Sequence, residues 1–234
     1  MMTTVFGQFL EFSVPTHDIQ ESLNFYHELG FSELPVGDVR DYHYGVVTDG
    51  RIAIGLHAGG IDEPALTFVK NDVASSLRDV APDEDTLSFT RLGSETFNEI
   101  GLHTPDGHML IMMEARTFSQ ADLSALPAPV TGHSVEISLG CRDLDNAMKY
   151  WAGAGFTASH YPEDEMVELL VPGLRLGLRT DLPPGKTALR FAPNDLEQTL
   201  LSLERSNVPV QRKPAYHQVM SPEGTQLELF AADF

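Results

Sequence analysis

Hydrophobic and polar residues alternate near the start of the chain, between positions 9 and 14. The even-numbered positions carry large apolar side chains, whereas Glu11 and Ser13 fall on the opposite side of an extended segment. This period of two predicts a strand with one buried face. A helix is predicted next, because Asp18 is a typical N-cap, apolar residues then recur at helical spacing, and Gly30 provides a C-terminal stop.

Similar patterns continue through the first half of the chain. Two strand-like runs, Tyr42–Thr48 and Arg51–His57, are joined by Asp49-Gly50, a dipeptide typical of hairpin turns. The following sequence predicts a second unit, which contains one strand, a helix capped by Asp72 and three further strands. These strands are expected at Ala65–Val69, near Thr86–Leu92, at Glu99–His103 and at His108–Glu114. The first half is therefore predicted to contain two βαβββ units.

The whole pattern occurs twice. Segment Leu10–Phe31 aligns with Val135–Phe156, and Glu11 then matches Glu136. Two more pairs follow in the same order, ALTFVKNDVASSL with ALRFAPNDLEQTL and HTPDGHMLIM with MSPEGTQLEL. Three matches in one order indicate an internal duplication. We therefore expect an α+β fold of four βαβββ units.

Length and composition fit two domains. The 234 residues, of which 42% are hydrophobic, suffice for two cores of ordinary domain size. Serine and proline recur between Ala115 and Gly132, which is typical of a linker. We predict an N-terminal domain at 1–117, a linker at 118–131 and a C-terminal domain at 132–234.

The chain is strongly acidic, with 34 Asp and Glu against 15 Lys and Arg and a formal charge of −19. Such a surface repels phosphate backbones and anionic lipids, so we expect neither a nucleic-acid nor a membrane partner. The single cysteine, Cys141, allows no intramolecular disulfide and no multi-cysteine metal site. The N-terminal segment lacks the basic and apolar regions of a secretory leader. We expect a cytoplasmic protein.

Several motifs recur at corresponding places. The helices have Asp caps, an aromatic pair precedes Gly-Phe in both halves (Phe25-Tyr26 before Gly30-Phe31), and the turns carry Pro-Asp-Gly or Pro-Glu-Gly. In this combination the chain resembles the vicinal-oxygen-chelate superfamily, which contains glyoxalase I, extradiol dioxygenases and the fosfomycin- and bleomycin-resistance proteins. The resemblance implies the two-domain form, in which paired βαβββ units make two cup-shaped half-barrels around ligand cavities.

Enzymes of this superfamily hold a divalent metal with a His on a first strand, a His or Glu on the partner unit's first strand, and a Glu on a last strand. The corresponding positions are Glu11, Ala65 and Ile111 in the N-terminal cup, and Glu136, Ala188 and Glu228 in the C-terminal cup. Neither set matches the family's metal triad. We therefore expect no usual His/Glu metal centre and no cofactor.

Strand alternation directs several polar residues to one face of the C-terminal cup. The set is Glu136, Ser138, Arg175, Arg179, Arg190 and Glu228. Two carboxylates buried together without a cation repel each other, so arginines on the facing strands would neutralise and stabilise them. One interpretation is a self-satisfied ion-pair network. The other is a ligand site in which Arg179 or Arg190 binds a carboxylate or phosphate, and Glu136 or Glu228 acts as a base.

Candidate substrate-binding residues also occur elsewhere. Glu11, Met109 and Met113 are expected on the cavity face of the N-terminal cup, with His57 at its rim. Methionines adapt to irregular ligands, although these two side chains would serve equally well as core. His217 precedes the last strand and is expected to reach toward the C-terminal cup.

The leading hypothesis is a metal-independent protein that binds a small organic molecule, either sequestering it or catalysing proton transfer of the isomerase or lyase type. The alternative is a metal-dependent lyase, isomerase or dioxygenase with a divergent site. That site would use Glu136, Glu228 and His217, and carboxylates would favour Mn, Mg or Ca. A third possibility is a non-enzymatic scaffold. Both a monomer and a homodimer are compatible with these patterns.

Overall fold

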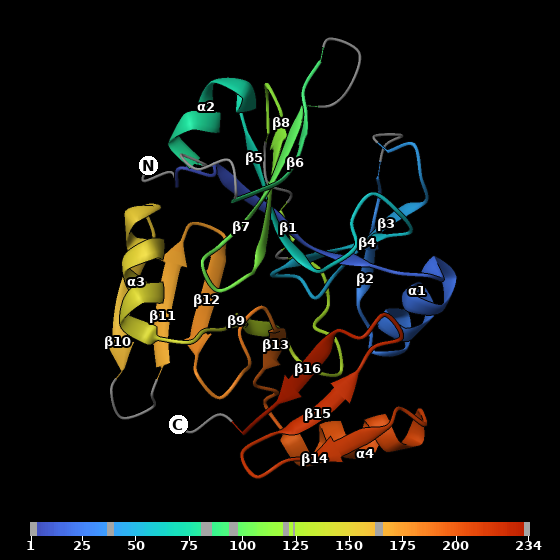
Figure 1. Ribbon diagram of the computed structural model, residues 1–234. Coiled ribbons are helices and arrows are strands. Elements are labelled where there is room, and N and C mark those ends of the chain that lie inside the picture. The colour runs from blue at the N-terminus through green and yellow to red at the C-terminus, as the bar shows by residue number, and fades with distance from the viewer. Residues whose placement is uncertain are drawn as a thin grey trace. The chain divides into compact units, whose positions relative to one another are not determined.

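The computed structural model describes residues 4–36, 40–80, 86–93, 98–118, 122–123, 125–161 and 166–231. These residues form an α+β fold with two eight-stranded sheets (Figure 1). Both sheets are mixed, because β5 pairs in parallel with β8 and β13 in parallel with β16, while the hairpin strands pair antiparallel. No helix in the described part of the chain is long and apolar enough to cross a membrane.

The first sheet has the strand order β2-β3-β4-β1-β5-β8-β7-β6. Its strands are β1 (Gln8–Pro15), β2 (Ser32–Leu34), β3 (Tyr44–Thr48), β4 (Ala53–His57), β5 (Ala65–Lys70), β6 (Leu87–Arg91), β7 (Glu99–His103) and β8 (Met109–Glu114). Helices α1 (Ile19–Glu28) and α2 (Val73–Val80) follow β1 and β5.

The second sheet repeats this order as β10-β11-β12-β9-β13-β16-β15-β14. Its strands are β9 (Ser134–Gly140), β10 (Thr157–Tyr161), β11 (Met166–Val171), β12 (Leu174–Arg179), β13 (Thr187–Phe191), β14 (Val210–Arg212), β15 (His217–Met220) and β16 (Gln226–Leu229). Helices α3 (Leu144–Gly153) and α4 (Leu196–Arg205) follow β9 and β13. Identical strand order in both halves confirms the predicted duplication and the four βαβββ units.

The helices begin where the sequence predicts. Asp18, Asp143 and Asp195 are N-caps whose carboxylates accept backbone N–H groups of the first turn. At α2, Asp72 accepts the Ser75 N–H at 3.0 Å. Gly30 follows α1 with a φ of 87°, a left-handed conformation suited to glycine. The short strand β2 was not predicted, because three residues are too few to show a period.

The chain divides into two compact units that do not follow the order of the sequence. Unit 1 contains 1–12, 64–121 and 139–186, whereas unit 2 contains 13–63, 122–138 and 187–234. Each sheet falls within one of the predicted domains, 1–117 and 132–234. Each compact unit instead combines βαβββ units from both halves. Of the predicted linker 118–131, residues 119–121 and 124 lie outside the described residues.

Unit 2 joins the last βαβββ unit to the first one without the start of β1, and it also contains residues 134–138 of β9. Helix α1 packs on β2, β3 and β4, and α4 packs on β14 (Figure 1). Phe31, which follows α1, meets Phe191 of β13 at a ring-centroid distance of 6.2 Å. The Glu223 carboxylate, in the turn before β16, accepts hydrogen bonds from Ser22 and Tyr26 of α1.

Unit 1 joins the second βαβββ unit to the third one without the start of β9, and it also contains residues 8–12 of β1. Helix α3 packs on β10, β11 and β12, and α2 on β7 and β8 (Figure 1). Trp151 of α3 packs against Phe6 and Phe156, with ring centroids 6.2 and 4.8 Å away. The turn before β8 contacts the start of the α3 segment, because Asp106 accepts the Arg142 N–H at 3.1 Å. Trp151 and its duplicate Tyr26 are thus core residues of their units.

Candidate functional site

Four polar side chains come together on one face of the second sheet, within unit 2. Glu136 and Ser138 lie on β9, Arg190 on β13 and Glu228 on β16. These strands are consecutive in the sheet, in the order β9-β13-β16. The intervening residues, such as Ile137, are apolar and buried, as expected for strand alternation. We call Glu136, Ser138, Arg190 and Glu228 the polar cluster.

Arg190 links the two carboxylates of the polar cluster. Its Nη1 donates to Glu136 Oε1 at 3.2 Å, and its Nε forms an ion pair with Glu228 Oε2 at 3.6 Å. The parallel register places Arg190 directly beside Glu228. On another side, the Arg190 Cζ lies 4.2 Å from the centroid of the Phe230 ring, a cation–π contact. The guanidinium is therefore fixed by both charge and packing.

Further hydrogen bonds orient each carboxylate. Ser138 Oγ donates to Glu136 Oε1 at 2.7 Å, and Gln226 Nε2 donates to Glu228 Oε1 at 2.8 Å. Glu228 is fully buried and Glu136 is 6% exposed, whereas the Arg190 side chain is 22% exposed. Solvent therefore reaches the cluster at Arg190 and, to a small extent, at Glu136. Buried charges of this kind persist only when paired and hydrogen-bonded.

The structure does not bring His217 into the polar cluster. In the antiparallel register of β15 and β16, His217 pairs with Leu229, and Gln218 pairs with Glu228. Directly paired residues share a face of a sheet, so His217 lies on the face opposite Glu228. The prediction that His217 reaches this site is therefore wrong. The neighbouring residue, Gln218, occupies the position beside Glu228 that was expected for His217.

Arg179 has a different partner from the one expected. Its Nε and Nη2 donate to the two carboxylate oxygens of Asp181, at 2.9 and 2.7 Å, in a bidentate pair. Arg175 forms an ion pair with Glu168 at 3.3 Å. Both arginines belong to unit 1. The structure shows Asp181 as a partner of Arg179 and Glu168 as a partner of Arg175.

His57 is buried rather than at a rim. It is 1% exposed, and the Tyr42 hydroxyl lies 3.0 Å from its Nδ1. The rings of Tyr42 and Tyr44 lie 5.9 and 4.7 Å from the imidazole, centroid to centroid. Arg40 in turn stands over both tyrosine rings. This aromatic setting belongs to unit 2.

The predicted N-terminal candidates Glu11, Met109 and Met113 are all buried in unit 1. They are 1%, 6% and 9% exposed. The register of β5 and β8 sets Met109 beside Ala65 and Met113 beside Val69. This burial agrees with the interpretation that the two methionines fill the core.

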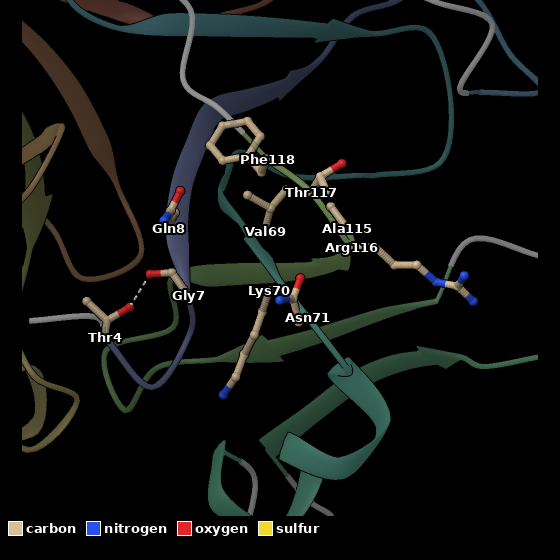
Figure 2. Close-up of a pocket in the computed structure, with 10 residues that line it drawn as sticks. All are labelled: Thr4, Gly7, Gln8, Val69, Lys70, Asn71, Ala115, Arg116, Thr117 and Phe118. Carbon is tan, nitrogen blue, oxygen red and sulfur yellow. Dashed lines mark hydrogen bonds between the residues drawn. The ribbon is translucent and has the colours of Figure 1, made fainter. Parts of the chain in front are cut away.

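A separate pocket of about 610 Å³ lies in unit 1, at the ends of β5 and β8 (Figure 2). Its cations are Lys70 and Arg116, and the Lys70 ammonium donates to the Val5 carbonyl at 2.7 Å. Figure 2 shows Lys70 and Arg116 pointing in different directions. None of the residues predicted for the site lines it. Because its two cations diverge and Lys70 is bonded to a backbone carbonyl, it is a weaker candidate than the polar cluster.

The polar cluster does not fit a metal of the expected kind. The first-strand position of β13 is Ala188, which has no donor atom, and the Arg190 guanidinium contacts both glutamates. Across the described ranges, no three His, Cys, Asp or Glu side chains are grouped so that they could hold a metal ion. The donor set therefore differs from the His/Glu triad that the sequence resemblance implies.

No protein-family model matches the sequence, and no curated protein does. Solved structures match over nearly the whole chain at low identity. A variant of homoprotocatechuate 2,3-dioxygenase from B. fuscum is 12% identical, with a TM-score of 0.66 over 97% of this chain and 71% of that one. The 2,3-dioxygenase LapB from Pseudomonas sp. KL28 is 17% identical, with a TM-score of 0.61 over 100% and 94%. A catechol 2,3-dioxygenase is 13% identical, with a TM-score of 0.60 over 99% and 89%. At such identities the likeness concerns the fold.

Proposed function

We propose that this chain, which has the fold of the extradiol dioxygenases of the vicinal-oxygen-chelate superfamily, binds a small organic molecule at the polar cluster without the usual His/Glu metal centre. The observation that carries the proposal is the buried Glu136–Arg190–Glu228 arrangement, in which carboxylates and a cation are held on three neighbouring strands. Fixed polar groups on a rigid sheet are the usual means of orienting a small ligand.

The charges of the cluster indicate which ligands suit it. Two carboxylates outnumber the one guanidinium, and Arg190 already contacts both of them. A carboxylate or phosphate ligand would have to displace a buried glutamate from Arg190, which is costly. A molecule with hydroxyl or amino donors would instead find a carboxylate acceptor. The expectation that Arg190 binds an anionic group is therefore replaced by a preference for hydrogen-bond donors.

The two glutamates have different roles in this proposal. Glu136 is the more exposed, so it accepts a hydrogen bond or a proton from the ligand. Glu228 is fully buried and is held by Gln226, so it positions Arg190. Sequestration needs only the hydrogen bond. An isomerase or lyase reaction would also use Glu136 as a general base that removes a proton and returns or releases it.

The experiment is a thermal-shift screen with two matched sets of small compounds, phenols and amines in one and carboxylates in the other. Glu136→Gln tests the acceptor, and Glu168→Gln, which alters the Glu168–Arg175 ion pair in unit 1, is the control. We expect at least one phenol or amine to stabilise the wild type and Glu168→Gln but not a folded Glu136→Gln. Equal stabilisation of Glu136→Gln, preference for carboxylates, or no ligand effect would favour the purely structural ion-pair network.

The alternative of a carboxylate site for Mn²⁺, Mg²⁺ or Ca²⁺ has less support. Its third predicted ligand, His217, lies on the other face of the sheet. The remaining pair, Glu136 and Glu228, already has a cation between its members in the form of Arg190.

A further inference from the structure

We propose that Arg190 is a built-in cation that closes the Glu136–Glu228 pair to divalent metals, and that removing its guanidinium creates a metal site there. The inference concerns the residues of the polar cluster alone and does not depend on the organic ligand. The fold leads one to expect a metal centre at these strands, but this chain places an arginine between the two carboxylates.

The position of Arg190 in the sheet carries the argument. It lies on β13, the strand between β9 and β16, so its side chain has a carboxylate on either side. The guanidinium reaches Glu136 at 3.2 Å and Glu228 at 3.6 Å. A divalent ion bound by the same two carboxylates would need oxygen atoms at roughly 2.0–2.6 Å. Guanidinium and metal therefore compete for the same oxygens.

Electrostatics explains why one cation excludes the other. Two buried carboxylates repel each other and require a positive charge between them. An arginine is always protonated in proteins, so Arg190 provides that charge permanently. Adding a divalent ion beside it would place like charges together in a site that is almost shielded from water. Ser138 and Gln226 strengthen this closed state by bonding the carboxylate oxygens.

The groups left after removal of Arg190 are oxygen donors. Glu136 and Glu228 supply carboxylates and Ser138 supplies a hydroxyl, while the neighbouring Gln226, whose Nε2 now donates to Glu228, carries an amide oxygen that a rotation of the amide group would present. Such an all-oxygen set suits hard cations, namely Mn²⁺, Mg²⁺ and Ca²⁺, rather than Zn²⁺ or Fe²⁺. We therefore expect the opened site to differ in metal preference from sites built with imidazole.

The test is Mn²⁺ binding, measured by isothermal titration calorimetry and electron paramagnetic resonance without any organic ligand. The variants are Arg190→Ala and Arg190→Gln, and the latter keeps a neutral side chain of similar length. Arg175→Ala is the control, because it removes an arginine from a more exposed ion pair. We expect Arg190→Ala to bind about one Mn²⁺ per chain at least tenfold more tightly than the wild type and Arg175→Ala. Adding Glu228→Ala to Arg190→Ala should abolish the gain.

Two results would overturn the proposal. One is a stoichiometric divalent ion in the wild type whose binding is lost in Glu136→Gln. The other is a folded Arg190→Ala and a folded Arg190→Gln that bind Mn²⁺ no better than the wild type. If both variants are unfolded in chelator, refolding on addition of Mn²⁺ supports the proposal, whereas failure to refold contradicts it. A negative result in the organic-ligand screen leaves this outcome unaffected, so the two proposals fail separately.

Discussion

Tyr26 and Glu223, 197 residues apart in the chain, share a hydrogen bond of 2.7 Å from the phenol to the carboxylate. Tyr26 is fully buried, and burial together with the neighbouring Glu223 charge raises the pKa of Tyr26 well above 10. The second oxygen of Glu223 accepts the Ser22 hydroxyl at 2.9 Å. Helix α1, near the start of the chain, is thereby tied to the turn before the last strand.

Tyr26→Phe should destabilise the protein by about 2 kcal/mol, because it removes a buried hydrogen bond to a charged acceptor while keeping the ring. The free energy of unfolding from urea titration measures this loss. Tyr150→Phe is the matched control, since Tyr150 occupies the duplicate position of Phe25 and should tolerate phenylalanine. Equal effects of the two substitutions would show that the Tyr26–Glu223 bond contributes nothing specific.

Stability should fall between pH 8 and pH 10. Burial, with smaller contributions from Asp106 and Asp143, raises the pKa of Cys141 from 9.0 to about 11. In this interval the unfolded chain loses the thiol proton and the folded chain retains it, so rising pH favours unfolding. At pH 10 the loss from Cys141 is about 1 kcal/mol. Urea titrations at both pH values measure it.

Cys141→Ala is the control for this pH dependence. It should reduce the difference between pH 8 and pH 10 by about 1 kcal/mol, whatever it does to stability at pH 8. Tyr150, whose pKa is raised by burial to about 12, and Tyr26 add a smaller decline as the pH approaches 10, where unfolded tyrosines begin to lose their protons, and a larger one above pH 10. A slope that is unchanged in Cys141→Ala would assign the effect to other groups.

Asp49→Ala should cost about 3 kcal/mol of stability. The fully buried Asp49 carboxylate accepts the Arg51 N–H at 2.8 Å and the Ile52 N–H at 2.9 Å, and it also accepts the Ser134 N–H at the start of β9. Alanine leaves these donors without their acceptor. Thermal and urea unfolding measure the loss, and Asp62→Ala at an exposed position is the control. Similar values for both would contradict this account of Asp49.

Gly7→Ala should destabilise the protein by about 3 kcal/mol. Gly7 has a φ of 105°, and a Cβ there would overlap the Val69 carbonyl oxygen beside the pocket of Figure 2. Gly153→Ala, at the end of α3, meets no described atom within 4 Å and should be stabilising by about 0.5 kcal/mol. The opposite signs, read from unfolding midpoints, distinguish backbone strain from a general intolerance of glycine replacement.

Local patterns predicted the secondary structure well and the assembly of the units poorly. Segment Glu99–His103 was predicted with the bounds of β7, and the Asp caps mark the helix starts. The pairing of the first βαβββ unit with the last was not predicted. It depends on tertiary contacts such as Tyr26–Glu223 and Phe31–Phe191. The sequence around each of these residues does not indicate which distant residue it contacts.

The candidate site was predictable where strand parity could be counted from a helix cap. Counting back from Asp143 and Asp195 placed Glu136 and Arg190 on one face, and the structure shows them in contact. His217 was misplaced, because no cap fixes the register of the residues before β15. The Asp181 partner of Arg179 was not predicted, because Asp181 lies beyond the end of β12, where alternation no longer applies.

The composition of the compact units sets an order for folding on the ribosome. Residues 13–63 leave the ribosome early, yet their partners in unit 2 extend to residue 234. Unit 1 has its last segment, 139–186, available before synthesis ends. We therefore expect unit 1 to fold during translation. Residues 13–63 would remain without their partners from 187–234, with part of their apolar surface exposed to solvent. An arrest late in synthesis would leave that surface exposed to chaperones and proteases.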